Sequence, residues 1–97
     1  MTTVDVDAIQ AAAERLMALA DYLGQRGFAT HLVRTAGGLR LRVTHRTVGL
    51  LSEDVYAAPA GDGAWWFWWS WAEQITGIED VTAAAAKIAH VLTPRHG

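Results

Sequence analysis

The apolar residues near the amino terminus recur with the period of an α-helix. They are spaced four, three, four and three residues apart, so a helix places them on one stripe. Asp5 or Asp7 can stabilise the start of such a helix, and Gly24 or Gly27 can adopt the left-handed backbone that ends it. The pattern predicts an amphipathic helix over residues 5–25. Its buried stripe would consist of Ile9, Ala13, Leu16, Ala20 and Leu23.

Two strands are predicted over residues 28–35 and 39–45, joined around Gly37-Gly38. The first strand contains two adjacent apolar residues, Leu32 and Val33, which would point to opposite faces of a sheet. Its hydrophobic pattern therefore does not choose between the two faces. The register of this strand is left open.

The second of these strands separates apolar from basic side chains. Leu41 and Val43 fall on one face, and Arg40 and Arg42 fall on the other. Residues 28–49 contain four of the eight basic residues and none of the ten acidic ones, so this part carries +4 and the remainder −6. We expect the apolar face to pack on a core and the basic face to meet water or a partner.

A third strand is predicted over residues 51–58. Val55 and Ala57 are opposite in parity to Asp54 and Tyr56, so a strand separates an apolar pair from a polar pair. The same division into a core face and an outer face is therefore expected in two neighbouring strands.

All five tryptophans lie within residues 65–71, which follow a turn over residues 59–63. Aromatic residues favour strands, and successive side chains of a strand point to opposite faces. A small domain can bury one set in its core, but the other set needs a further layer, a partner or a ligand. One face would hold Trp65, Phe67, Trp69 and Trp71, and the other would hold Trp66, Trp68 and Ser70.

The last part of the chain predicts a second helix that ends near Leu92, before Pro94. Thr76 and Glu79 have the spacing of a capping box, in which a hydroxyl and a carboxylate satisfy free backbone amides of the first turn. The buried stripe of this helix would consist of Val81, Ala84, Ala85, Ile88, Val91 and Leu92.

The order helix, four strands, helix predicts one α+β domain over residues 1–97. Short turns favour a four-stranded antiparallel meander with an amino-terminal and a carboxy-terminal helix. Two arrangements remain open. Both helices can cover one face and leave the other bare, or one helix can cover each face and place every tryptophan in the core.

If one face is bare, it collects the residue types that dominate protein-interface hot spots. We therefore expect a non-enzymatic interaction or adaptor module that forms a homodimer about a two-fold axis or docks a protein partner. The alternative is single-stranded nucleic-acid or small-ligand binding on the same face, but the net charge of −2 disfavours nucleic acid. We call this surface the Trp/Arg face; it consists of Arg40, Arg42, Tyr56, Trp66 and Trp68.

The sequence predicts no catalytic, cofactor or metal site. It has no cysteine, and its four histidines show no ligand-pair spacing. His31 and His45 could approach one another across the first hairpin, although no acidic residue lies nearby in sequence to orient them. Glu73 and Gln74 follow the Trp-rich strand, so a small pocket between that strand and the second helix is a further hypothesis.

The amino terminus lacks the pattern of a signal peptide, and no apolar run reaches the ~20 residues of a membrane-spanning helix. We therefore expect a cytoplasmic protein. The segment Trp65–Ile75, WWFWWSWAEQI, and the Ala-rich helix after it resemble small uncharacterised Trp-rich proteins of high-GC actinobacteria. This resemblance implies no activity and no residue role. In layout, the chain is similar to dimeric chaperone-like adaptor domains of bacteria.

Overall fold

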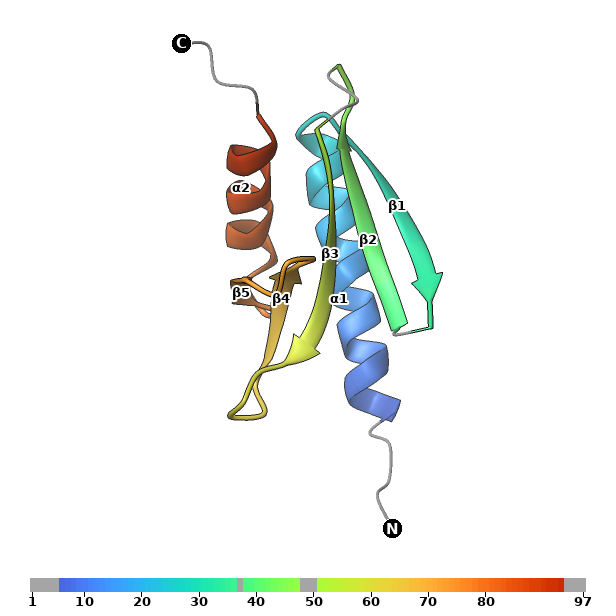
Figure 1. Cartoon of the computed structure of the whole chain (residues 1–97), viewed down its shortest axis with the longest axis vertical. Coiled ribbons are helices and arrows are strands. Elements are labelled where there is room, and N and C mark those ends of the chain that lie inside the picture. Colours follow the sequence, from blue (N-terminus) through green and yellow to red (C-terminus); the bar gives the residue numbers. More distant parts are fainter. Residues whose placement is uncertain (1–5, 37, 48–50, 94–97) are drawn as a thin grey trace.

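The computed structural model describes residues 6–36, 38–47 and 51–93. Its α+β class and antiparallel meander confirm the prediction, but the described residues form five strands rather than four. The predictions for Asp5, Gly37 and Pro94 lie outside the described residues. The elements in chain order are α1 Val6–Gln25, β1 Phe28–Thr35, β2 Gly38–His45, β3 Ser52–Pro59, β4 Trp65–Trp69, β5 Gln74–Gly77 and α2 Val81–Leu92 (Figure 1).

The sheet has the order β1-β2-β3-β4-β5, and every neighbouring pair is antiparallel. The open register of β1 is resolved by its pairing with β2. Leu32 lies opposite Leu41 and shares the core face, whereas Val33 lies opposite Arg40 on the outer face. Leu32 is still 41% exposed, because β1 is the edge strand and has a neighbour on one side only.

The fifth strand follows a tight reversal directly after the Trp-rich strand. The N–H of Ala72 donates to the carbonyl of Trp69 over 2.9 Å, and the N–H of Trp69 donates to the carbonyl of Glu73 over 2.8 Å. Ala72 has a φ of 66°, a backbone conformation that turns often require. The chain then pairs back on β4, with Gln74 opposite Trp68.

The predicted capping box at Thr76 and Glu79 is wrong, because Thr76 belongs to β5 and α2 begins only at Val81. Asp80 caps the helix instead, and its Oδ1 accepts a hydrogen bond from the N–H of Ala83 over 3.3 Å. The Thr76 hydroxyl donates to the carbonyl of Asp80. Sequence spacing alone therefore placed the start of the helix several residues too early.

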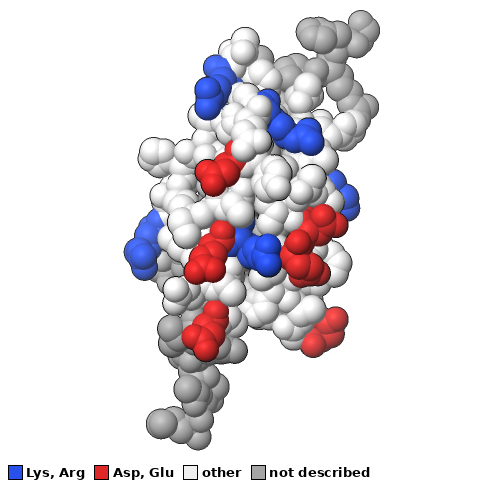
Figure 2. Space-filling view, turned by 180° about the vertical axis from the view of Figure 1, so that it is seen from behind, with Lys and Arg blue, Asp and Glu red and all other residues white. Residues whose placement is uncertain are grey.

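Both helices lie on the same face of the sheet, which excludes the arrangement with one helix on each face. α1 contacts β1, β2, β3 and α2, and α2 contacts β5. In Figure 1 the long strands pass in front of α1. Figure 2 shows the molecule from behind, where acidic and basic side chains are interspersed over the helix side.

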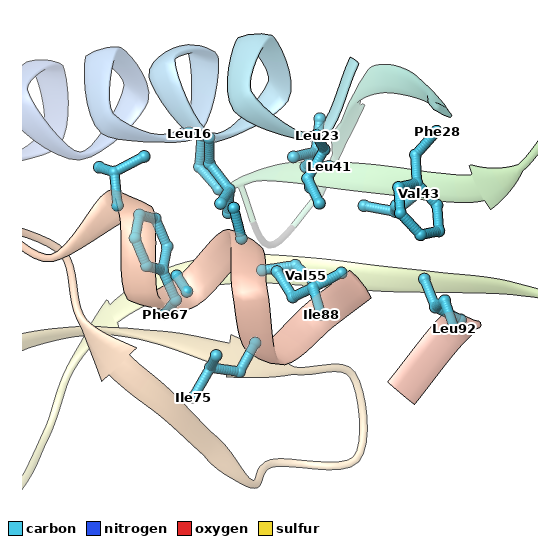
Figure 3. Packing of buried hydrophobic residues seen from close by; sticks show 14 of the residues in the cluster. Leu16, Leu23, Phe28, Leu41, Val43, Val55, Phe67, Ile75, Ile88 and Leu92 are labelled. Carbon is cyan, nitrogen blue, oxygen red and sulfur yellow. The ribbon is translucent and has the colours of Figure 1, made fainter. Parts of the chain in front are cut away.

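A single core fills the space between the helices and the inner sheet face (Figure 3). On α1 the buried positions are Ala12, Leu16, Leu19 and Leu23, so the stripe is rotated slightly from the predicted one, and Ile9 is 50% exposed. On α2 the predicted stripe is confirmed except for Val91, which is 52% exposed. The central sheet residues are Leu41, Val43, Val55, Phe67, Trp69 and Ile75.

The two apolar residues Ile88 and Val91 of α2 provide a test of this packing. Ile88 is fully buried, so Ile88→Ala should lower the free energy of unfolding by about 2–5 kcal/mol. Val91→Ala should change it by about 0.5 kcal/mol or less, because the Val91 side chain already meets solvent. Urea denaturation followed by circular dichroism measures both values. Equal losses in the two variants would contradict the helix orientation.

Candidate functional site

The strand register brings the Trp/Arg face together on the side of the sheet opposite the helices. Tyr56 of β3 lies directly between Arg40 of β2 and Trp68 of β4. Trp66 lies opposite Ala58, one pleat further along the same face. The predicted assignment of these side chains to one face is therefore confirmed.

A stacked row of side chains crosses three strands of this face. The guanidinium carbon of Arg40 lies 5.2 Å from the centre of the Tyr56 ring. The rings of Tyr56 and Trp68 are nearly parallel, at 7°, with their centres 6.3 Å apart. The indole N–H of Trp68 donates to the carbonyl of Ala58 over 3.0 Å, which holds the ring against the sheet. We call this set the Arg–Tyr–Trp row.

Arg42 is paired with an acidic residue that the sequence did not place beside it. Arg42 Nε donates to Asp54 Oδ1 over 2.9 Å, and Nη2 donates to Oδ2 over 3.3 Å. The hydrogen bond to Asp54, and then its negative charge, raise the pKa of Arg42. The parity of Asp54 indicated its face, but only the β2–β3 register shows that it lies opposite Arg42. The face therefore carries both signs of charge.

The core-side assignment of the aromatic segment holds for Phe67 and Trp69, which are buried, whereas Trp65 is half-buried. Trp71 contradicts it. Because β4 ends at Trp69, Trp71 lies in the turn and is 50% exposed. Its ring stacks on that of Trp69 at 4.9 Å and 6°, and its indole N–H donates to Glu73 Oε2 over 2.8 Å.

A shallow hollow of about 400 Å³ lies where the sequence suggested a pocket, between the β4–β5 hairpin and α2. Glu73, Gln74 and Lys87 contribute to its lining. Two of these three side chains already have hydrogen-bond partners within the chain. Glu73 accepts from Trp71, and Lys87 Nζ donates to the carbonyl of Ile75 over 3.1 Å. We do not assign a ligand to this hollow.

The two histidines of the first hairpin are not brought together. His31 lies opposite Arg42 on the outer face, and His45 lies opposite Phe28 on the core face. The His45 ring packs edge-on against Phe28 with ring centres 5.6 Å apart. Within residues 6–36, 38–47 and 51–93, no group of three or more His, Cys, Asp or Glu is placed to hold a metal ion.

The comparisons with known proteins found no matching family model, no similar curated protein and no similar solved structure. The resemblance to Trp-rich actinobacterial proteins therefore stays an expectation. Neither of the two described helices has the length and apolarity to cross a bilayer.

The turn that carries Trp71 can be tested through Ala72. A non-glycine residue at positive φ, such as Ala72, destabilises the folded state by roughly 1–2 kcal/mol, and glycine removes this strain. Glycine also makes the unfolded chain more flexible, which lowers the stability of the fold by roughly 0.4–1 kcal/mol. Ala72→Gly should therefore raise the free energy of unfolding by up to about 1 kcal/mol. Ala86→Gly, at an exposed position within α2, should lower it by about 1 kcal/mol. Denaturant titration compares the two, and a loss in Ala72→Gly would contradict the turn geometry.

Proposed function

We propose that this chain is a non-enzymatic protein-interaction module that self-associates through its Trp/Arg face. The observation that carries the proposal is the packing of both helices on one side of the sheet. Among the described residues, no helix or strand covers the opposite side. Tyr56, Trp66 and Trp68 are half-buried on that side, and contact with a second protein surface would remove the rest of their rings from water. The proposal involves no cofactor.

A second copy of the chain suits this face because a two-fold interface must be complementary to itself. The face contains both partners of a cation–π contact, namely arginine and aromatic rings. Arg40 of one copy over an indole of the other would contribute about 0.5–2 kcal/mol. Repulsion between the two copies is limited, since Asp54 neutralises Arg42 within each of them.

The size of the face indicates how stable such a dimer would be. The five strands have 8, 8, 8, 5 and 4 residues. At about 4.8 Å between strands and about 3.3 Å per residue they cover roughly 500 Å² in projection. Side-chain relief increases the accessible area, which is then of the order of the ~800 Å² per partner of a standard interface and well short of a large obligate one. We therefore expect reversible association that depends on protein concentration.

The face is suited to contact rather than to acid–base chemistry. The carboxylate of Asp54 is held by Arg42, and the indole N–H of Trp68 is held by a backbone carbonyl. Both groups are therefore already engaged in hydrogen bonds within the chain. The rigid row of rings also loses little side-chain freedom on binding, which favours association.

Sedimentation velocity over a range of protein concentrations tests self-association. The wild-type chain should shift from monomer towards dimer as concentration rises. The double variant Trp66→Ala/Trp68→Ala should remain monomeric, because it removes the apolar area of the interface. Arg40→Glu should also weaken the dimer, since it removes the cation of the cation–π contact and places a carboxylate beside the aromatic rings of the interface.

Arg34→Glu is the matched control for the charge reversal. Arg34 lies opposite Leu39 and so belongs to the other face of the sheet, where it is exposed. Its reversal should leave association unchanged. A wild-type chain that stays monomeric at all concentrations would overturn self-association, and equal weakening by both charge reversals would remove the Trp/Arg face as its location.

Nucleic-acid binding on the same face predicts a different result. Binding to phosphates weakens steeply with salt, in proportion to the number of free cations. Because Asp54 engages Arg42, Arg40 is the one cation of the Trp/Arg face without an ion pair among the described residues. A single cation gives little phosphate binding, so we expect fluorescence anisotropy to show no steeply salt-sensitive binding of a labelled single-stranded oligonucleotide. Binding that is lost in Trp66→Ala/Trp68→Ala and weakens with salt would instead support the nucleic-acid alternative.

A further inference from the structure

The sheet splits at one end, between β2 and β3. Their pairing stops at Arg40 opposite Tyr56. β2 nevertheless stays paired with β1 as far as Gly38, and β3 stays paired with β4 as far as Pro59. Beyond Tyr56 the two strands therefore diverge, and Figure 1 shows β3 curving away from β2 in front of α1.

A cavity of about 420 Å³ lies where the strands diverge, and it is lined by residues of β2, of β3 and of the amino-terminal half of α1. The volume lies in the range of roughly 300–1,000 Å³ typical of small-molecule sites. Ile9 lies on this lining and is 50% exposed, which leaves a large apolar side chain without cover at the cavity. The apolar walls consist of Ile9, Ala12, Ala13, Leu16, Leu39, Ala57 and Ala58.

Arg40 is the one charged residue among the described residues that line the cavity. Its guanidinium lies over the Tyr56 ring, and no ion pair of Arg40 is found within the described part of the chain. Tyr56, which lies beneath this guanidinium, also lines the cavity. Aliphatic walls together with one arginine match a molecule that has an alkyl chain and an anionic end.

We propose that this cavity, the split-sheet pocket, binds a medium-chain alkyl carboxylate. The alkyl chain lies against α1 between the diverging strands, and the carboxylate is bound by Arg40. The aliphatic walls contribute affinity in proportion to the apolar area of the ligand that they cover. Arginine provides two parallel donors that match a carboxylate, so it selects an acid over an alcohol or an amine of the same length.

Calorimetric titration with hexanoate, octanoate and decanoate, each below its micelle concentration, tests the pocket. Affinity should rise with chain length until the cavity is filled, whereas decylamine should not bind. Arg40→Gln should weaken decanoate binding at least tenfold and leave decanol binding unchanged. Amide chemical shifts in NMR spectra should move at Ile9, Leu39 and Ala57, which line the pocket, more than at Trp66.

A pair of tryptophan substitutions on α1 separates the pocket from the Trp/Arg face. Ala13 lines the cavity, so Ala13→Trp should fill it and abolish decanoate binding. Ala11 is exposed and does not line the cavity, so Ala11→Trp should bind decanoate like the wild type. Both substitutions lie on α1, away from the proposed dimer face, so sedimentation should be unchanged in either variant.

Two results would overturn the pocket: no binding of any carboxylate in the series, or binding that Ala13→Trp and Ala11→Trp reduce equally. Shifts confined to residues around Trp66 would also overturn it. If Ala13→Trp does not fold, the NMR shifts of the wild-type chain and the weaker binding expected of Arg40→Gln still test whether decanoate binds in this pocket. Because Arg40 also belongs to the proposed dimer face, the titrations are made at a protein concentration at which sedimentation shows the monomer. The comparison of Ala13→Trp with Ala11→Trp does not involve that face.

Discussion

The packing of two helices against one face of a five-stranded sheet is the constraint on which the rest of the structure depends. The chain contains two described helices, and their buried stripes meet the same inner residues, including Val55 and Phe67. Burying those side chains supplies the main stabilising free energy of the fold. Once both helices are used on this side, no element among the described residues remains to cover the other side. The Trp/Arg face is therefore a consequence of how the core is built.

Side chains on the outer face of the sheet are held in place by contacts with one another. Arg40, Tyr56 and Trp68 stack across three strands, and Arg42 is held by Asp54. Within the described part of the chain, no buried side-chain nitrogen or oxygen lacks a hydrogen-bond partner. A surface ordered in this way needs little rearrangement to bind a partner or a ligand. Arg40 belongs to both proposed sites: on the Trp/Arg face it lies over the Tyr56 ring, and it also lines the split-sheet pocket.

Several local predictions failed because an apolar period does not show where the opposing layer ends. Ile9 lies near the start of α1 and Trp71 lies beyond the end of β4, and both are half exposed. Val91 lies at the margin of the α2 stripe and is exposed, although the next residue, Leu92, is buried. The capping box at Thr76 failed because β5 extends through that position before the chain reaches Asp80. Four-residue strands such as β5 contain too few positions for a recognisable alternation.

The sequence by itself determined the elements with strong periodicity, the separation of Leu41 and Val43 from Arg40 and Arg42, and the division of the tryptophans between two faces. These follow from the fixed geometry of a strand, which sends neighbouring side chains apart. Only the tertiary structure decided that both helices share one face, that Asp54 lies opposite Arg42, and that β2 and β3 diverge beyond Tyr56. Those features depend on contacts between segments distant in the chain, and local periodicity contains no information about which segments meet.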